Sequence, residues 1–298
     1  MSPDTTPDAD APSSPAFPDG ADFRIEIPSV EGPQVLTDVL AEAEAIGVTV
    51  NRVSQGSGAA MLSRAELRSM AQIAADSGVE VCLFQAARAS WDIGVLAHMP
   101  DGTGHEVAVR GDAAMHRAIA DVERAVECGI RGFLIGDLGL LTELVDRQRS
   151  GDLPASITWK ISAALAVANG AMARLVTELG ATTINIPADL PAEIVGELRR
   201  STVLPLDLYL EGSDGMGGTV RIAEAVELLD VGAPMYLKFG LRNATPVYPS
   251  GVHRVESASL QAREKVRRAA VALEWMEHFG SSFVQSAPGA AGLAVPQP

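Results

Sequence analysis

The chain has 298 residues, 47% of them hydrophobic, which is enough for one large hydrophobic core. Its 38 acidic and 23 basic residues give a formal charge of −15, a field that repels nucleic-acid phosphates and predicts no nucleic-acid partner. No apolar run is long enough to cross a bilayer, so the sequence predicts no membrane partner either.

The two ends of the chain differ in composition from its middle. Residues 1–21 are rich in Pro, Asp and Ser and predict a disordered tail, without the basic and apolar regions of a signal peptide. Residues 285–298 are rich in Ala, Gly and Pro and predict a loose C-terminal tail. Residues 22–284 are therefore expected to form a single domain.

The sequence contains two cysteines, Cys82 and Cys128. The first falls in a predicted strand and the second near the end of a predicted helix. These positions are typical of buried, reduced thiols and favour a cytoplasmic protein.

Eight short apolar segments alternate with eight segments of helical character. Strands are expected at 24–28, 48–55, 79–85, 132–137, 157–162, 182–187, 206–211 and 235–240. Helices are expected at 33–46, 63–77, 114–127, 141–149, 169–179, 191–200, 219–229 and 257–279. Eight strand–helix units predict an α/β fold of the (β/α)8 TIM-barrel type. A doubly wound open sheet is the rival, but no GxGxxG sequence follows the first strand.

Two connections are long enough to act as lids or binding loops, and both follow a strand. The connection 86–115 contains Arg88, Trp91, Asp92, His98, His105 and Arg110. The connection 241–256 contains Arg242, Asn243, Tyr248, Ser250 and His253. In a TIM barrel both would rise from the face that carries the active site.

Alternation along each strand predicts which side chains enter the barrel. In 206–211 the leucines must meet the helices, which turns Asp207, Tyr209 and Glu211 inward. The same rule places Lys160, Asn185, Lys238, Glu26 and Asp137 inside. Buried charges must be paired, so this polar interior is either a site or a network that only satisfies itself.

The catalytic candidates are the ionisable members of this set: Glu211, Lys238, Lys160, Asp137 and Asp207. The substrate-binding candidates are polar or flexible residues near the strand ends: Asn185, Tyr209, Arg52, Gln85, Ser162, Gly217, Arg242 and Tyr248. Gly217 belongs to the loop 212–220, whose glycines and following helix start could approach an anion. Arg52 and Arg242 are candidates for gripping a carboxylate.

Three mechanisms can use these residues. In general acid–base chemistry, Glu211 or Asp137 moves a proton while Lys160 or Lys238 stabilises an oxyanion. In Schiff-base chemistry, one of the two strand lysines is the nucleophile. A divalent metal held by Glu211, Asp137 or Glu26, with His105 or His253, is the third alternative, although no HxH or HExxH spacing supports it. No cofactor is required by the sequence.

Between residues 129 and 211 the chain resembles the U32 peptidase-like, or collagenase-like, family. The resemblance lies in GIRGFLIGDLG (129–139) and in ANGAMARLVTELGATTINIPADLPAEIVGEL (168–198). It implies a barrel and a hydrolase lineage. Iron–sulfur members of that family carry cysteines just after the strand that corresponds to 206–211, where this chain reads EGSDGMGG. The chain therefore resembles a divergent member without the cluster.

These observations predict a cytoplasmic barrel enzyme that acts on a small polar or anionic molecule by general acid–base chemistry, as a C–N hydrolase or a lyase. The alternatives are a Schiff-base lyase or aldolase that uses a strand lysine, and a non-catalytic binding or scaffold subunit derived from a U32-like barrel. The expected partner is a small-molecule substrate, and assembly into a homo-oligomer is compatible with the sequence.

Overall fold

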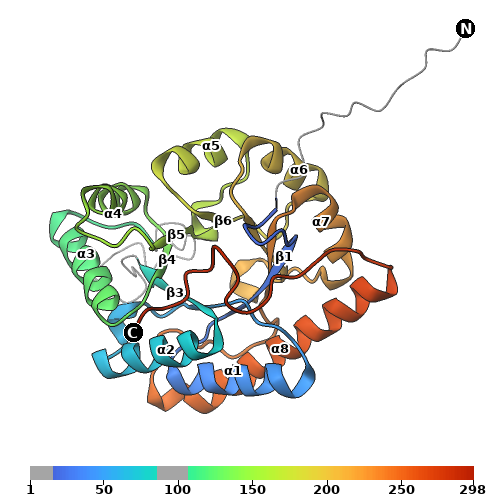
Figure 1. Ribbon diagram of the computed structural model, residues 1–298, viewed down its shortest axis with the longest axis horizontal. Helices are drawn as coiled ribbons and strands as arrows, with labels where there is room; N and C mark the ends of the chain where they lie inside the picture. The colour runs from blue at the N-terminus through green and yellow to red at the C-terminus, as the bar shows by residue number, and fades with distance from the viewer. Residues whose placement is uncertain (1–15, 86–106) are drawn as a thin grey trace, which may run out of the picture.

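Eight parallel strands pair in chain order and close through β8 and β1, so the predicted (β/α)8 barrel is confirmed (Figure 1). The computed structural model describes residues 16–85 and 107–298. The strands are β1 Phe23–Pro28, β2 Arg52–Gln55, β3 Glu80–Gln85, β4 Gly132–Ile135, β5 Thr158–Ile161, β6 Thr183–Asn185, β7 Leu206–Glu211 and β8 Met235–Phe239.

The helices surround the barrel and cover the apolar faces of the strands (Figure 1). They are α1 Pro33–Ile46, α2 Arg64–Ser77, α3 Asp112–Glu127, α4 Leu138–Ser150, α5 Gly170–Leu179, α6 Ala192–Ser201, α7 Ala225–Gly232 and α8 Val255–His278. The capping box predicted at the start of α2 is present: Ser63 accepts a hydrogen bond from the Glu66 amide, and the Glu66 side chain accepts one from the Ser63 amide.

Hydrophobic burial holds the helix layer onto the barrel. Outward-facing strand residues such as Ile25, Ile27 and Leu237 are almost fully buried against it. The long helix α8 packs on α1, β1 and β8 and covers the seam where the barrel closes. Both cysteines are buried free thiols, as the sequence predicts. None of the helices in 16–85 and 107–298 is long and apolar enough to cross a membrane.

Two terminal segments, residues 16–22 and 285–298, pack across the amino-terminal end of the barrel (Figure 1). Residues 285–298 were expected to be loose, but Gln285 forms a β-bridge with Phe23, and the Ser286 carbonyl accepts a bond from Asn51. Of the predicted disordered tail 1–21, residues 1–15 lie outside the described part. Phe17 and Ala21 are buried, because they pack under the barrel.

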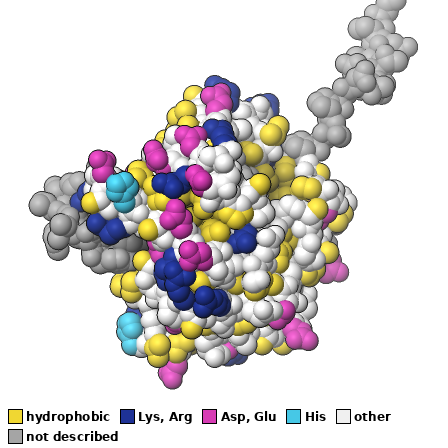
Figure 2. Space-filling model, turned by 60° about the vertical axis from the view of Figure 1, so that its left-hand side comes forward, with side chains coloured by type: hydrophobic (Ala, Val, Ile, Leu, Met, Phe, Trp, Pro, Cys, Tyr) yellow, Lys and Arg dark blue, Asp and Glu magenta, His cyan; other side chains and the backbone are white. Residues whose placement is uncertain are grey.

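Arg24 joins these segments to the barrel. Its Nε donates to Ser286 Oγ at 2.9 Å, its Nη2 donates to the Ala291 carbonyl at 2.6 Å, and its guanidinium lies 4.1 Å from the centre of the Phe17 ring. The Arg24 side chain, which is only 1% exposed, therefore holds both terminal segments at the amino-terminal end of the barrel. On the face shown in Figure 2, by contrast, acidic and basic side chains are interspersed at the surface.

The Arg24→Met variant should lose about 2–4 kcal/mol of unfolding free energy, because several buried hydrogen bonds lose their donor and the terminal segments lose their anchor. Urea denaturation measures the loss. Arg267→Met, at an exposed Arg267–Glu264 pair, is the matched control and should be near neutral. Equal effects of the two variants would contradict this role of Arg24.

Candidate active site

One carboxylate, Glu26 of β1, lies at the centre of the barrel interior among three cations. Arg52 Nε donates to Glu26 Oε2 at 2.7 Å, Lys160 contacts the same oxygen, and Lys238 Nζ lies 2.9 Å from Oε1. Ser54 Oγ also donates to Oε1 at 2.7 Å. Each of the three cations is at most 1% exposed, so this group is shielded from water.

Asp207 of β7 is the second carboxylate of this layer. Arg52 Nη2 donates to its Oδ2 at 2.6 Å, Lys160 Nζ lies 3.0 Å from the same oxygen, and Thr183 Oγ1 donates to it at 3.2 Å. The other oxygen, Oδ1, is buried and has no hydrogen-bond partner within 16–85 and 107–298. We call Glu26, Arg52, Lys160, Asp207 and Lys238 the charge layer; it holds three cations and two carboxylates.

A third carboxylate connects the charge layer to the base of the barrel. Glu80 of β3 lies 3.6 Å from Arg52 Nη1 and accepts a 3.3 Å hydrogen bond from Tyr236 Oη. The same hydroxyl accepts a 3.0 Å bond from Arg24 Nη1. The Arg52 guanidinium also lies 3.4 Å from the centre of the Tyr236 ring. Arg24 has a second carboxylate, Asp19, at 3.7 Å, so the network as a whole contains four cations and four carboxylates, and Glu80 balances the charge layer.

The charge layer shifts the titration of its members. Burial by itself raises the pKa of the Glu26 carboxyl, but the three surrounding cations outweigh it and hold that pKa well below its usual range. Burial, reinforced by the neighbouring Arg52 charge, lowers the pKa of Lys160 although Asp207 and Glu26 oppose the shift.

Lys238, Tyr209 and Asn185 form the side of the charge layer that faces the carboxyl ends of the strands. Lys238 Nζ lies 4.4 Å from the centre of the Tyr209 ring. The Asn185 amide can accept from Lys238 Nζ at 3.1 Å while it donates to the Asp207 carbonyl at 3.2 Å. Burial raises the pKa of Tyr209 and keeps it a neutral phenol.

Glu211 does not face the barrel interior, and the predicted register is wrong at this residue. The pairing of β7 with β8 shifts between Tyr209 and Glu211, which places Glu211 opposite Phe239 rather than in the row of Lys238. Its carboxylate lies 3.1 Å from Arg268 Nε on α8 and accepts a 3.1 Å bond from the Arg242 amide. An irregularity of one residue reverses the face of every side chain beyond it.

Asp137, Ser162 and Gln85 lie at strand ends, and two of them cap local structure. Asp137 is the N-cap of α4, where its carboxylate accepts from the amides of Leu140 and Val109. Ser162 accepts from the Ala164 amide at the start of a short 3-10 turn. Gln85 is buried at the end of β3, and its amide nitrogen has no partner among the described residues.

The loop after β7 does not lead directly into a helix. The expected helix start at residue 219 is wrong: Val220 forms an antiparallel bridge back to Glu211, and α7 begins at Ala225. Gly217, with φ +89°, lies in this loop. The Asp214 carboxylate pairs with Arg242 Nε at 2.9 Å and accepts from the Asn243 amide. Arg242 is thus occupied by a carboxylate of the chain itself.

The loops after β1, β2 and β8 are fastened to one another by the buried Glu31. Its carboxylate accepts from the amides of Gly56 and Ser57 and from the Ser57 hydroxyl. Ser57 Oγ in turn accepts from the Ser250 amide at 2.8 Å. Burial raises the pKa of Glu31 in spite of these bonds. This side of the barrel mouth is therefore a fixed structure.

Tyr248 and Lys265 support the same loops. The Tyr248 hydroxyl lies 2.6 Å from Ser29 Oγ, and its ring covers Gly56, where an added Cβ would come within 2.4 Å of it. Lys265 of α8 donates to the Pro28 carbonyl at 2.8 Å, and burial lowers its pKa to about 8.

A metal site finds no support in the part of the chain that the structure describes, where no group of three or more His, Cys, Asp and Glu side chains could hold an ion. His105, one of the loop candidates, lies outside the described residues, as do Arg88, Trp91, Asp92 and His98.

The structure brings four of the candidates predicted from the sequence into one layer: Lys160, Lys238, Asp207 and Arg52. Tyr209 and Asn185 lie against this layer. The sequence analysis missed the part played by Glu80 and Arg24, and it placed Arg52 near a strand end rather than in the barrel interior. The signal was present in the alternation of β2, where Val53 faces the helices and Arg52 must therefore face inward with Ser54.

Comparison with known proteins identifies no family for this chain. No protein-family model and no curated protein matches the chain. CutC from Streptococcus agalactiae is 14% identical, with a TM-score of 0.49 over 72% of this chain and 97% of its own. A U32 peptidase is 16% identical, with a TM-score of 0.43 over 68% of this chain and 74% of its own. 2,3-Dimethylmalate lyase is 13% identical, with a TM-score of 0.48 over 94% of this chain and 87% of its own.

The Glu26→Gln variant should lose about 3–5 kcal/mol of unfolding free energy, since three buried cations lose a charged partner. Urea denaturation measures this loss. The double variant Glu26→Gln, Lys160→Met removes one uncompensated cation and should recover part of it. Glu264→Gln, at an exposed ion pair, is the control. A double variant that is less stable than Glu26→Gln would contradict the charge layer as described.

Lys265 predicts a rise in stability at alkaline pH. Its pKa is about 8 in the folded state and 10.5 in the unfolded state, so the unfolded chain binds more protons between these values. Raising the pH from 7 to 11 should stabilise wild type relative to Lys265→Met by on the order of 3 kcal/mol, measured by urea denaturation at each pH. A difference that does not change with pH, as expected for the control Arg267→Met, would contradict the prediction.

Proposed function

We propose that this chain is an enzyme that binds a small anionic molecule above the charge layer, at the carboxyl ends of β6, β7 and β8. The observation that supports the proposal is the unequal sharing of carboxylates in the charge layer: Arg52 and Lys160 contact both Glu26 and Asp207, whereas Lys238 contacts Glu26 alone. Lys238 is the cation on the mouth side of that layer, and Tyr209 lies directly over it. An anion at this position would give Lys238 a second negatively charged partner beside Glu26.

Tyr209 would take part through its hydroxyl. Because burial keeps the phenol protonated, the hydroxyl can donate a hydrogen bond to an oxygen on which negative charge develops. The reaction class that we propose is general acid–base chemistry in which such an oxyanion forms, as in hydrolysis of a C–N bond or in a lyase step. Glu211 and Asp137 are not part of this proposal. Glu211 pairs with Arg268, and Asp137 caps α4.

The pairing of the strand lysines argues against a Schiff base. Lys160 contacts two carboxylates and Lys238 one, and neither side chain is more than 1% exposed. A nucleophilic lysine needs a neutral amine that a carbonyl carbon can reach. A non-catalytic binding subunit shares the anion site but predicts no turnover, so activity assays separate the two.

The proposal is tested by thermal unfolding with malonate, acetate and inorganic phosphate as probes. At least one of them should raise the Tm of wild type saturably, because a ligand of the folded state stabilises it by mass action. Lys238→Met should bind that anion roughly tenfold or more weakly, since it loses one buried charge-assisted contact. Lys265→Met is the matched control and should bind it as wild type does.

Absence of a saturable shift with every anion, or an equal shift in Lys238→Met, would overturn the anion site. The catalytic part is tested by release of ammonia from small carboxylate-bearing amides and by carbonyl formation from β-hydroxy acids. Tyr209→Phe should lower kcat with little change in KM if the hydroxyl acts on the developing oxyanion. Anion binding without turnover of any of these substrates would favour the non-catalytic alternative.

A further inference from the structure

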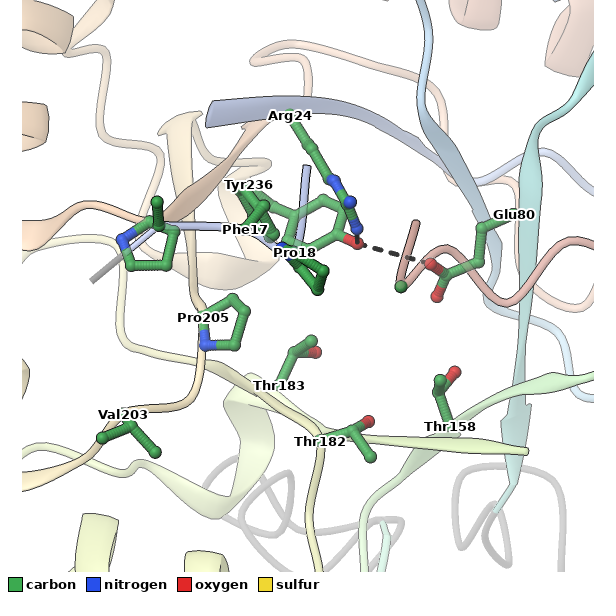
Figure 3. Close-up of a pocket in the computed structure, with 13 residues that line it drawn as sticks. Phe17, Pro18, Arg24, Glu80, Thr158, Thr182, Thr183, Val203, Pro205 and Tyr236 are labelled. Atoms are coloured by element: carbon green, nitrogen blue, oxygen red, sulfur yellow. Dashed lines mark hydrogen bonds between the residues drawn. The ribbon is translucent and has the colours of Figure 1, made fainter. Parts of the chain in front are cut away.

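A cavity of about 260 Å³ lies at the amino-terminal end of the barrel, and Figure 3 shows the side chains that line it. It lies on the opposite side of the charge layer from the proposed active site, because its lining comes from the starts of the strands. Its walls come from the starts of strands and from the segments that close the base. Thr158 and Thr183 begin β5 and β6, and Pro205 and Pro234 precede β7 and β8. Phe17, Pro18 and Gly292 of the terminal segments complete the lining.

Hydroxyl groups dominate one side of this base cavity. Thr158, Thr182 and Thr183 lie together across the cavity from Arg24 and Glu80 (Figure 3). The hydroxyl oxygens of Thr158 and Thr182 are buried, and neither has a hydrogen-bond partner in the part of the chain that the structure describes. Buried hydroxyls that are left unpaired cost free energy, and a ligand with hydroxyls of its own can both donate to them and accept from them.

The charged groups of the base cavity compensate each other. Arg24 and Glu80 are both bonded to the Tyr236 hydroxyl, at 3.0 and 3.3 Å, and all three side chains are at most 2% exposed. A second carboxylate, that of Asp19, lies 3.7 Å from Arg24 Nη2. An ionic ligand would find no uncompensated charge here, which separates this cavity from the charge layer above it.

The remaining walls are apolar. Val203, Pro205 and Pro234 present carbon surface on the side of the terminal segments and the strand starts. The volume lies below the roughly 300–1,000 Å³ of sites for drug-sized ligands, which limits an occupant to a small molecule. Carbon surface beside two unbonded hydroxyl groups suits a molecule with C–H faces and several hydroxyl groups of its own.

We propose that the base cavity is a binding site for a small uncharged polyol, with the hydroxyls of Thr158 and Thr182 as its specific contacts. The two terminal segments close the site, so that their packing under the barrel forms its floor. This site does not depend on the proposed function, because it lies at the other end of the barrel and is lined by different residues.

Saturation-transfer difference NMR with glycerol, erythritol and ribitol tests the proposal on the full-length protein. At least one polyol should bind saturably. Thr158→Val and Thr182→Val keep the shape and strand propensity of threonine but remove the hydroxyl, and each should weaken binding roughly three- to tenfold. Thr142→Val, at an exposed position of α4, is the matched control and should leave binding unchanged.

Either of two results would overturn the polyol site, and a third would overturn its ligand class. One is the absence of saturable binding of all three polyols to wild type. The other is binding that both threonine variants retain in full. Whatever the binding result, each valine variant should have a Tm at or above that of wild type, because it removes an unpaired buried hydroxyl. The Tm measurement therefore confirms that the variants fold. Preferential binding of acetate or phosphate that both threonine substitutions weaken would assign the cavity to an anion and overturn the uncharged class.

Discussion

The rest of the barrel depends on the carboxylate of Glu26. Three cations from β2, β5 and β8 reach it in a space from which water is excluded, and their charges would repel one another without it. Barrel interiors of this fold are usually filled with branched aliphatic side chains. Here ion pairs fill the middle of the interior instead. They require β2, β5 and β8 to place Arg52, Lys160 and Lys238 within reach of Glu26 on β1.

The charge layer also divides the barrel into two ends with different electrostatics. Toward the strand carboxyl ends it presents Lys238 under Tyr209, with Glu31 fastening the loops beside it. Toward the amino-terminal end, Arg24 and Glu80 neutralise each other around Tyr236. A positive upper side suits an anion, whereas a neutral lower side lined by hydroxyls suits an uncharged polar molecule. A single buried layer thus accounts for both proposed sites.

Much of this architecture could be predicted from the sequence because it follows from periodicity. Alternation in regular strands placed Lys160, Asp207, Tyr209 and Lys238 inside, and the structure agrees. Glu211 could not be placed in this way, because a register shift has no signature in the pattern of polar and apolar residues.

Composition failed at the ends of the chain for a related reason. The Ala-, Gly- and Pro-rich segment 285–298 looks unable to fold, yet it needs no core of its own. Its backbone amides and carbonyls bond to Glu80, Arg24 and Gly78 of the barrel end, and Ser286 is almost fully buried there. Pairing with a distant surface is not visible in local composition.

The central claim is that the charge layer is fixed and that Lys238 is the cation that meets an anionic ligand. The chain has only three lysines, at 160, 238 and 265, so nitrogen-15 labelling of the lysine side chains gives one signal for each. Three distinct signals are expected at neutral pH. Addition of the anion that raises the Tm, among malonate, acetate and phosphate, should shift the signal of Lys238 and leave that of Lys160 in place. Signals that all coincide with that of free lysine, or a shift confined to Lys160 or Lys265, would contradict it.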